Sequence, residues 1–385
     1  MKITISVGGR FHAFNLAQQL FKRGHLQKLI TSYPKFEVAK YGIPKEKIKS
    51  IIIKEIIERG WRKLPYFLRN IYNPQYLIHE IFDKSASKKI EKTDIFVGWA
   101  SFALNSFKKA KKIGMLTVLD EGSSHILYRR DIVKEECEKF GIKPELPHPK
   151  LVEKELREYE EADYITVSSL FARRTFLEKG IPENKIIHVP YGVDLSDFKQ
   201  ISKNDNVFRV IFSGGMSLRK GVHYLLQAFS ELNLPNSELL LIGAFNDEIK
   251  PFFKKYEGKY KWLGHIPQKE LYKYYSQGSV FVLNSIEDGF GMVIIQAMAC
   301  ALPVIATTNT GGEDIIRDGI DGFIIPIRNN NSLKEKLLYF YQNPAICQQM
   351  GQSAKKRVSS GFTWDGYGNK IIKAYEHALA EDKKF

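Results

Sequence analysis

Two adjacent cations, Arg219 and Lys220, stand between a predicted strand and a predicted helix in the segment VIFSGGMSLRKGVHYLLQAF. The strand ends at Ser213 and is followed by Gly214 and Gly215, which let backbone N–H groups approach a ligand closely. A helix N-terminus favours negative charge, and two cations beside it can neutralise a diphosphate. The segment therefore predicts a phosphate site. The alternative is a basic turn in solvent, because most such cation pairs are simply surface.

A second candidate loop lies in SIEDGFGMVIIQAMACALPVIAT, where acidic residues and glycines precede a long apolar run. The apolar run predicts a buried helix whose N-terminus points into a cleft. Asp288 could serve only as the cap of that helix, with the glycines only making the turn. That interpretation does not account for Gly289 and Gly291 around an aromatic residue, or for Gln296 in a segment that should be core. A buried amide needs hydrogen-bond partners, and ligand hydroxyls would provide them.

The first half of the chain offers two more polar groups at predicted strand ends. In SVGGRFHAF, Gly8 and Gly9 follow the first strand, where they either approach a ligand or simply make a tight turn. The segment LTVLDEGSSHILYRR ends another strand, and its cleft-facing loop contains Asp120, Glu121, Ser123, Ser124 and His125. A single histidine is usually structural, but polar neighbours at the carboxyl end of a strand favour a functional role for His125.

Short runs rich in Ile and Val alternate with longer amphipathic stretches along the chain. This alternation predicts βαβ units around parallel sheets, and so an α/β fold. The strands expected in the first half lie at residues 2–7, 28–31, 94–98, 115–119, 163–167 and 186–190. Those expected in the second half lie at 208–213, 238–242, 260–263, 279–284 and 303–306, with no strand after about 326. The pattern breaks at VPYGVDLSDFKQISKNDNVFRV, so we expect a domain boundary there and a ligand site in the cleft between the halves.

The composition is that of a globular protein with an anionic partner. At 385 residues the chain is too long for one hydrophobic core, so two domains are expected. No stretch approaches the ~18 apolar residues of a membrane span, and the apolar start is too short for a signal peptide. Its three scattered cysteines predict neither disulfides nor a metal site, which favours a reducing, cytosolic compartment. The net charge of +15 implies attraction to nucleic acid, a phospholipid surface or a phosphorylated small molecule.

The ordered motifs resemble one family, the retaining glycosyltransferases of the GT-B fold, family 4, or glycosyl transferases group 1. They run from residue 1 to about 375 and include GG after the first strand, ADYITVSS, KIIHVPYGVDLSDF, SGGMSLRKG, LLLIGAF, WLGHIP, EDGFGMVIIQAMACALPVIAT and GGEDIIRDGIDGFIIP. The resemblance implies two Rossmann-like domains facing across a cleft, with the last helices crossing back to the first domain. The expected parts are an acceptor-binding domain (1–190), a linker (191–206), a nucleotide-sugar-binding domain (207–362) and a C-terminal helix (363–385).

The resemblance also implies roles for individual residues. Catalytic roles fall to His125, which contacts donor sugar or phosphate, to Arg219 and Lys220, which clamp the diphosphate, and to Asp288, which contacts a sugar hydroxyl. The implied donor-binding residues are Gly8, Gly9, Ser213, Gly214, Gly215, Gly243, Leu263, Glu287, Gly289, Phe290, Gly291, Met292, Val293 and Gln296, with Leu263 bordering the nucleobase. The family motif has two glutamates where this sequence has Asp288 and Gln296. An amide can replace the second, ribose-binding glutamate, whereas Glu287 competes with the shorter Asp288 for the first role.

The implied reaction is transfer of a hexose-type sugar from a UDP- or GDP-linked donor to a glycan or lipid-linked acceptor, in cell-surface polysaccharide or glycolipid synthesis. The resemblance implies that the configuration at the anomeric carbon is retained. No carboxylate pair like that of a glycosidase is required, because the departing phosphate can take the acceptor's proton while Arg219 and Lys220 stabilise its charge. Neither a cofactor nor a metal ion is expected, since side-chain cations and a helix N-terminus neutralise the phosphate. The sequence contains no Asp-x-Asp metal motif, in agreement with this expectation.

Basic segments of the first half, such as KYGIPKEKIKSIIIKEIIERGWRKLPYFLRNIY and FKKAKKIG, interleave cations with apolar side chains. They suit a cytoplasmic protein that rests on the inner face of a membrane, and packing within its own domain fits them equally well. Three other functions stay open: a catalytically idle GT-B scaffold, a nucleic-acid-binding protein and a sugar-nucleotide epimerase. The changes at Asp288 and Gln296 favour the first and the charge favours the second, although no nucleic-acid-reading motif is present.

Overall fold

The computed structural model describes residues 1–65 and 73–382, and this part of the chain contains two parallel β-sheets. The first sheet has seven strands in the order β3-β2-β1-β4-β5-β6-β7. Its strands are β1 (Ile3–Val7), β2 (Leu26–Thr31), β3 (Ile48–Ser50), β4 (Ile95–Trp99), β5 (Leu116–Glu121), β6 (Tyr164–Val167) and β7 (Ile186–His188). The central strands β1, β4 and β5 are buried along their whole length, as expected for a parallel sheet that is covered on both faces.

The second sheet has six parallel strands in the order β10-β9-β8-β11-β12-β13. Its strands are β8 (Phe208–Ser213), β9 (Ser237–Ile242), β10 (Lys261–Trp262), β11 (Val280–Leu283), β12 (Val304–Thr307) and β13 (Gly322–Ile325). Every strand expected from the sequence overlaps one of the observed strands. The sequence pattern missed β3 and β13, because each is a short strand at a sheet edge and carries too few residues to show a periodic apolar run.

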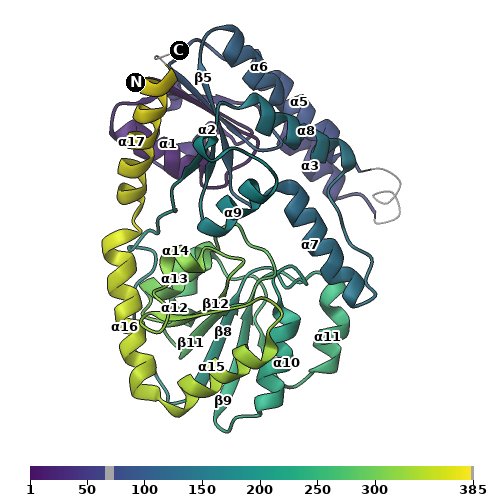
Figure 1. The fold of residues 1–385 in the computed structure, drawn as a ribbon, viewed down its shortest axis with the longest axis vertical. Helices are drawn as coiled ribbons and strands as arrows, with labels where there is room; N and C mark the ends of the chain where they lie inside the picture. The colour runs from purple at the N-terminus through teal and green to yellow at the C-terminus, as the bar shows by residue number, and fades with distance from the viewer. Residues whose placement is uncertain (66–72, 383–385) are drawn as a thin grey trace.

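Helices separate most of the strands. Those of the first half are α1 (Ala13–Lys22), α2 (Lys35–Ala39), α3 (Ile53–Arg62), α5 (Gln75–Ser87), α6 (Leu104–Lys112), α7 (Ile126–Lys139), α8 (Pro149–Glu161) and α9 (Leu170–Glu178). Those of the second half are α10 (Val222–Leu232), α11 (Lys250–Lys255), α12 (Leu271–Tyr275), α13 (Met292–Ala299), α14 (Gly312–Ile315), α15 (Asn330–Gln342), α16 (Pro344–Gly361) and α17 (Trp364–Asp382). Figure 1 shows the first half above the second, with α9 and α14 where they meet.

The last helix, α17, leaves the second half and packs on α1 of the first half (Figure 1). Two contacts fix the crossing: Arg23 Nε donates to Asn369 at 3.0 Å, and the Val193 N–H donates to the Phe362 carbonyl at 2.8 Å. The backbone of Thr363 lies so close to Gly192 that a Cβ there would come within 2.3 Å of it. The two Rossmann-like sheets and the returning helix confirm the predicted GT-B fold class, while residues 383–385 of the expected C-terminal helix lie outside the described residues.

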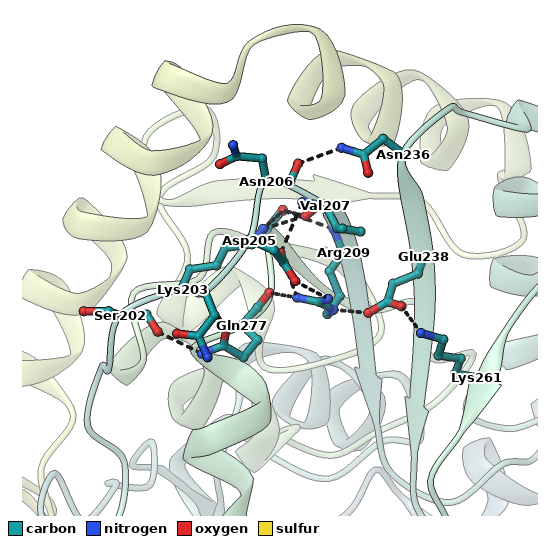
Figure 2. Close-up of polar contacts among 12 residues, drawn as sticks. Ser202, Lys203, Asp205, Asn206, Val207, Arg209, Asn236, Glu238, Lys261 and Gln277 are labelled. Atoms are coloured by element: carbon teal, nitrogen blue, oxygen red, sulfur yellow. Dashed lines mark hydrogen bonds and ion pairs between the residues drawn. The ribbon is translucent and has the colours of Figure 1, made fainter.

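A polar network anchors the segment that leads into β8 at the N-terminal ends of the second sheet (Figure 2). Arg209 lies at its centre, where it pairs with Glu238 and donates to the Gln277 carbonyl at 2.6 Å. A second guanidinium N–H donates to Asp205 at 2.9 Å. The network thus holds the entry to β8 at the end of the sheet opposite the predicted site. The exact limits of the linker stay a prediction.

Candidate active site

One large cavity, about 2110 Å³ in volume, lies between the carboxyl ends of the two sheets. In the second half, the predicted site residues that line it are Ser213, Gly214, Gly215, Lys220, Gly243, Asp288, Phe290, Gly291, Met292, Val293 and Gln296. In the first half, Gly8 and Gly9 line it after β1. The structure therefore brings most of the predicted site residues to a single cavity. His125, Arg219, Leu263, Glu287 and Gly289 lie outside its lining.

The loops after β8 and β9 form a wall of bare backbone. Gly214 and Gly243 have φ angles of +151° and +141°, which a residue with a side chain rarely adopts. A Cβ on Gly243 would come within 1.8 Å of the Gly214 carbonyl oxygen. Behind them, the Met216 N–H donates to the Ala244 carbonyl at 2.7 Å and joins the two loops. Glycine at 243 thus lets the two loops pack directly on each other, and their backbone lines the cavity.

Lys220 and Asp288 form an ion pair on this wall, from the loops after β8 and β11. Only 14% of the Lys220 side chain and 17% of the Asp288 side chain are exposed. Burial lowers the pKa of the Lys220 ammonium, although the Asp288 carboxylate favours its charged form. Asp288 also accepts a hydrogen bond from the Gly291 N–H at 3.1 Å, so it caps the start of α13 as well as holding Lys220. The capping and ligand-site interpretations of Asp288 are therefore compatible.

Helix α13 begins at the cavity because Gly291 turns the chain with a φ of +74°. A Cβ at this position would lie 2.5 Å from Leu283, so the turn needs glycine for space as well as for its backbone angle. Met292 and Val293 occupy its first turn and line the cavity. Gln296 follows on the same helix, is 7% exposed and also lines the cavity. The unusual amide in the apolar run is thus placed where a ligand can reach it.

Arg219 points away from the cavity and binds Glu287, which is completely buried. The Arg219 Nη1 donates to the Glu287 carboxylate and to its carbonyl, both at 3.0 Å. The other carboxylate oxygen of Glu287 accepts from Ser124 Oγ at 2.7 Å. Burial opposes ionisation of Glu287, but the charges of Arg219 and Arg129 and the Ser124 hydrogen bond lower its pKa to about 2. Neither residue of this pair is part of the cavity lining, while 37% of the Arg219 side chain is exposed.

His125 lies behind the first-half wall. It is 2% exposed, and its Nδ1 accepts the Leu127 N–H at 3.2 Å, which caps α7. Its ring packs against Tyr159 and Phe176 at centroid distances of 4.9 and 5.0 Å. Burial, with the charges of Lys179 and Arg129, lowers the pKa of His125 to about 4. The imidazole is therefore neutral near pH 7, and its placement gives it a structural contact rather than a cavity contact.

The first half lines the cavity with charged and aromatic side chains. Glu121, Arg129 and Glu155 belong to this wall, and the Tyr159 hydroxyl lies 3.2 Å from both carboxylates. A phenol has a single hydrogen to donate, so it cannot satisfy two ionised carboxylates. Burial and the charge of Glu155 raise the pKa of Glu121 well above its ordinary value. Glu121 therefore favours its neutral form in this buried position.

Residues 194–357 match the family model described as Glycosyl transferases group 1. The match covers 164 of the 385 residues, and it places the second half of the chain in this family. An uncharacterised glycosyltransferase of Methanocaldococcus jannaschii, MJ1178, is 31% identical over 196 residues, 50% of this chain and 54% of that relative. The capsular polysaccharide biosynthesis glycosyltransferase CapM of Staphylococcus aureus is 27% identical over 57% of this chain and 63% of CapM. The chain thus spans about half to three fifths of the length of these relatives.

Solved structures of other proteins share the fold of this chain. The sucrose-phosphate synthase of Thermosynechococcus elongatus matches with a TM-score of 0.72 and 17% identity, over 99% of this chain and 100% of that chain. HepE of Anabaena, in complex with UDP, matches with a TM-score of 0.69 and 15% identity, over 98% of this chain and 100% of that chain. These likenesses establish the GT-B fold.

Two further predicted residues, Leu263 and Gly289, lie just outside the cavity lining. Leu263 is 38% exposed at the end of β10, whereas its neighbours His265 and Ile266 line the cavity. Gly289 faces the first half, where a Cβ would lie 2.4 Å from the Gly122 carbonyl oxygen. The predicted segments are thus at the site, but in these two places a neighbouring residue provides the lining.

The sequence interpretation missed His12, which lies in the same loop as Gly8 and Gly9 and lines the cavity. Its Nε2 lies 2.9 Å from Asp120, and its ring packs against Tyr191 at a centroid distance of 4.0 Å. Beside it, Phe11 has a φ of +40° and is 59% exposed at the cavity. A histidine and an aromatic residue directly after the glycine pair, in GGRFHAF, were the available signal.

Proposed function

We propose that this chain is a hexosyltransferase that moves a sugar from a nucleotide diphosphate sugar to a glycan or lipid-linked acceptor, with retention at the anomeric carbon. One observation carries the proposal: Lys220, the glycine backbones after β8 and β9, and the N-terminus of α13 all line the same cavity. A cation, glycine backbone without side chains and the positive end of a helix each favour phosphate. The opposite wall, rich in charged side chains, is the proposed place of the acceptor.

For the donor we propose a UDP- or GDP-linked hexose. HepE of Anabaena, a protein with the same fold, has been solved in complex with UDP and with UDP-glucose. In our assignment the diphosphate lies against Gly214, Gly215 and Lys220, and Gly8 and Gly9 approach it from the first half. The sugar contacts the segment 290–293, Gln296 binds the ribose, and the base lies toward Ile266. Ser213 and Gly243 complete the wall behind the phosphates.

The proposed reaction needs no protein base. The bond between the anomeric carbon and the phosphate oxygen breaks as the acceptor oxygen bonds to that carbon from the same face. The acceptor's proton passes to the departing phosphate, so atoms and charges balance. Lys220 and the N-terminus of α13 stabilise the charge that develops on that phosphate. Asp288 holds Lys220 in place, and we assign phosphate neutralisation to these groups rather than to a metal ion.

On the proposed acceptor side, helix α3 has an apolar face that is exposed. In α3, the polar residues Lys54 and Glu55 line the cavity and are joined by an ion pair of 3.0 Å. On the other side of the helix, Ile53 and Ile56 are 44% and 59% exposed. We propose that this apolar face and the net charge of +15 hold the protein on the anionic inner face of a membrane, beside a lipid-linked acceptor.

Residues 66–72 of the basic stretch lie outside the described residues. None of the helices within residues 1–65 and 73–382 is long and apolar enough to cross a membrane. CapM is named for capsular polysaccharide biosynthesis, and by similarity we propose a role in cell-surface polysaccharide or glycolipid synthesis. Co-sedimentation with anionic and zwitterionic vesicles tests the surface: Ile56→Asp should weaken binding to the anionic vesicles, and unchanged binding would remove α3 from the proposal.

Calorimetry with UDP, GDP, ADP, CMP and their common sugar conjugates tests the central proposal. Binding of one nucleotide sugar, followed by slow hydrolysis or by transfer to an added acceptor, would support a transferase. Binding without turnover would favour an idle scaffold, an alternative that the residues Asp288 and Gln296 motivate. A folded protein that binds none of them would contradict the donor assignment, and strongly salt-dependent binding to random DNA would then favour a nucleic-acid function.

A further inference from the structure

Glu287 is a buried carboxylate shared between the two halves of the molecule. One oxygen, Oε1, accepts from Ser124 Oγ at 2.7 Å, from Ser123 Oγ at 3.1 Å and from the Ser124 N–H at 3.3 Å. The other oxygen, Oε2, accepts from Arg219 Nη1 at 3.0 Å. Glu287 has no exposed surface. Its two oxygens therefore face opposite halves, and neither is free for a ligand hydroxyl.

The Arg219 end of this bridge holds two loops of the second half together. The Ile286 N–H donates to the Arg219 carbonyl at 2.9 Å, while Arg219 Nη1 donates back to the Glu287 carbonyl at 3.0 Å. The next residues along these two loops are Lys220 and Asp288, which pair on the cavity wall. The position of Lys220 thus depends on the same pair of loop contacts that contains Arg219 and Glu287.

We propose that Glu287 is a positioning residue that couples closure of the cavity to the placement of Lys220. Contact with Ser124 of the first half fixes the Glu287 carboxylate, the carboxylate fixes Arg219, and Arg219 fixes the loop that carries Lys220. The proposal rests on the proposed function for its meaning, since Lys220 is the assigned phosphate cation. It also reassigns two predicted ligand contacts, Arg219 and Glu287, to a bridge behind the wall.

A merely structural role for Glu287 would differ from the proposed positioning role in one measurable respect: it would leave the placement of Lys220 unchanged. Other bonds also join the halves, such as the 2.8 Å hydrogen bond from Lys139 to the Tyr224 hydroxyl. Loss of the Tyr224 hydroxyl alone would weaken closure, while the ring stays packed against Ile286 and the contacts of Arg219 and Glu287 are kept. Ser124→Ala, by contrast, removes the shortest bond from the first half to Glu287 and leaves every cavity-lining side chain in place. Tyr224→Phe is therefore the matched control for Ser124→Ala.

The first readout is the reactivity of Lys220 in the ligand-free protein, followed by acetylation and mass spectrometry. We expect Lys220 to be acetylated at least threefold faster in Ser124→Ala and Glu287→Gln than in the wild type, because the ammonium is no longer held in its buried pair. Tyr224→Phe should match the wild type. Circular dichroism and thermal unfolding check that each variant is folded, and Ser124→Ala still decides the question if Glu287→Gln is not.

The second readout is a double-mutant cycle on affinity for UDP and for GDP. Ser124→Ala and Arg219→Met should each weaken binding by about tenfold, which is about 1.4 kcal/mol, and together by little more than either alone. The control pair, Tyr224→Phe with Arg219→Met, should be additive. Unchanged Lys220 acetylation in folded Ser124→Ala, or an additive Ser124–Arg219 cycle, would overturn the proposal. If the wild type binds neither nucleotide, the donor assignment fails, while the acetylation result still decides the role of Glu287.

Discussion

The two walls of the cavity are built from different material. The second-half wall has glycine backbone after β8 and β9, with the ion pair of Lys220 and Asp288 beside it, whereas the first-half wall has more charged side chains, such as Arg129 and Glu155. Glycine backbone lets a ligand approach closely whatever the side chains around it, and it suits a group that is the same in every donor, such as a diphosphate. Side chains can be exchanged without disturbing the strands beneath them. We infer from this contrast that acceptor choice, rather than donor chemistry, is where this scaffold is free to vary.

The backbone wall should tolerate a single methyl group badly. Gly243→Ala places a Cβ 1.8 Å from the Gly214 carbonyl at a φ of +141°, so we expect a loss of about 4 kcal/mol in the free energy of unfolding. Urea unfolding measures it. Gly258→Ala is the control, because its φ of +79° is also positive but its Cβ meets open space, and it should cost about 1 kcal/mol. Equal losses would show that the loop contact is unimportant.

The first wall is supported by a neutral histidine, and this should be visible in the pH dependence of stability. His125 has a pKa of about 4 in the folded protein and ~6.5 when unfolded, so the unfolded state binds the extra proton between these values. Stability from His125 is complete above pH 6.5 and is lost as the pH falls toward 4, by roughly 3 kcal/mol. Urea unfolding of wild type and His125→Asn, which keeps a capping side chain, should show a difference that grows with pH. A constant difference would mean that the imidazole is not desolvated.

Lys220 should matter more to the donor than Arg219 does, although the two are adjacent. Lys220→Met removes a charge-assisted contact worth about 1.5 to 3 kcal/mol, or roughly tenfold to a hundredfold in nucleotide affinity. Arg219→Met should cost about tenfold at most, because that side chain acts through Glu287. Calorimetry with the nucleotide identified in the panel compares them. A larger loss for Arg219→Met would place Arg219, and not Lys220, on the phosphates.

A substitution in the first-half wall should change kcat/KM for the acceptor and leave the affinity for the donor unchanged. Glu155→Gln keeps the shape of the wall but removes a charge and leaves one acceptor oxygen in place of two, so only one of the hydrogen bonds that Ser101 and Tyr159 donate to this side chain can be kept. We expect donor affinity to stay within twofold and kcat/KM for the acceptor to fall about fivefold, or about 1 kcal/mol. Steady-state kinetics with each substrate varied in turn separates the two effects. Weaker donor binding by Glu155→Gln would show that the first-half wall affects the donor as well as the acceptor.

The backbone wall could be predicted almost completely from the sequence. Glycines at strand ends and an apolar run after a polar turn are local signals, and they predicted Gly214 and Gly291, which line the cavity; Gly243, which also lines it, was implied by the family resemblance. The side-chain wall was harder to predict. Arg129 comes from the first turn of α7 and Glu155 from the middle of α8, and the packing of these two helices brings them to the cavity. No pattern around either residue distinguishes it from an ordinary surface charge.

The direction in which a side chain points was the other property that could not be predicted from the sequence. Arg219 and Lys220 are neighbours, yet one side chain turns toward Glu287 behind the wall and the other lines the cavity. Likewise His125 lies in the predicted loop but points into the core of the first half. Neighbouring residues in a loop share a location but not an orientation. The tertiary contacts that set the orientation lie more than 60 residues away, at Glu287 and Asp288.

The chain passes between the two halves twice, and the two passages touch. The Val193 N–H donates to the Phe362 carbonyl, and Gly192 packs directly on the backbone of Thr363. Because the two passages are joined here, we expect relative motion of the halves to pivot about residues 192–193 and 362–363. Such a pivot would bring the same two walls of the cavity together each time the halves close.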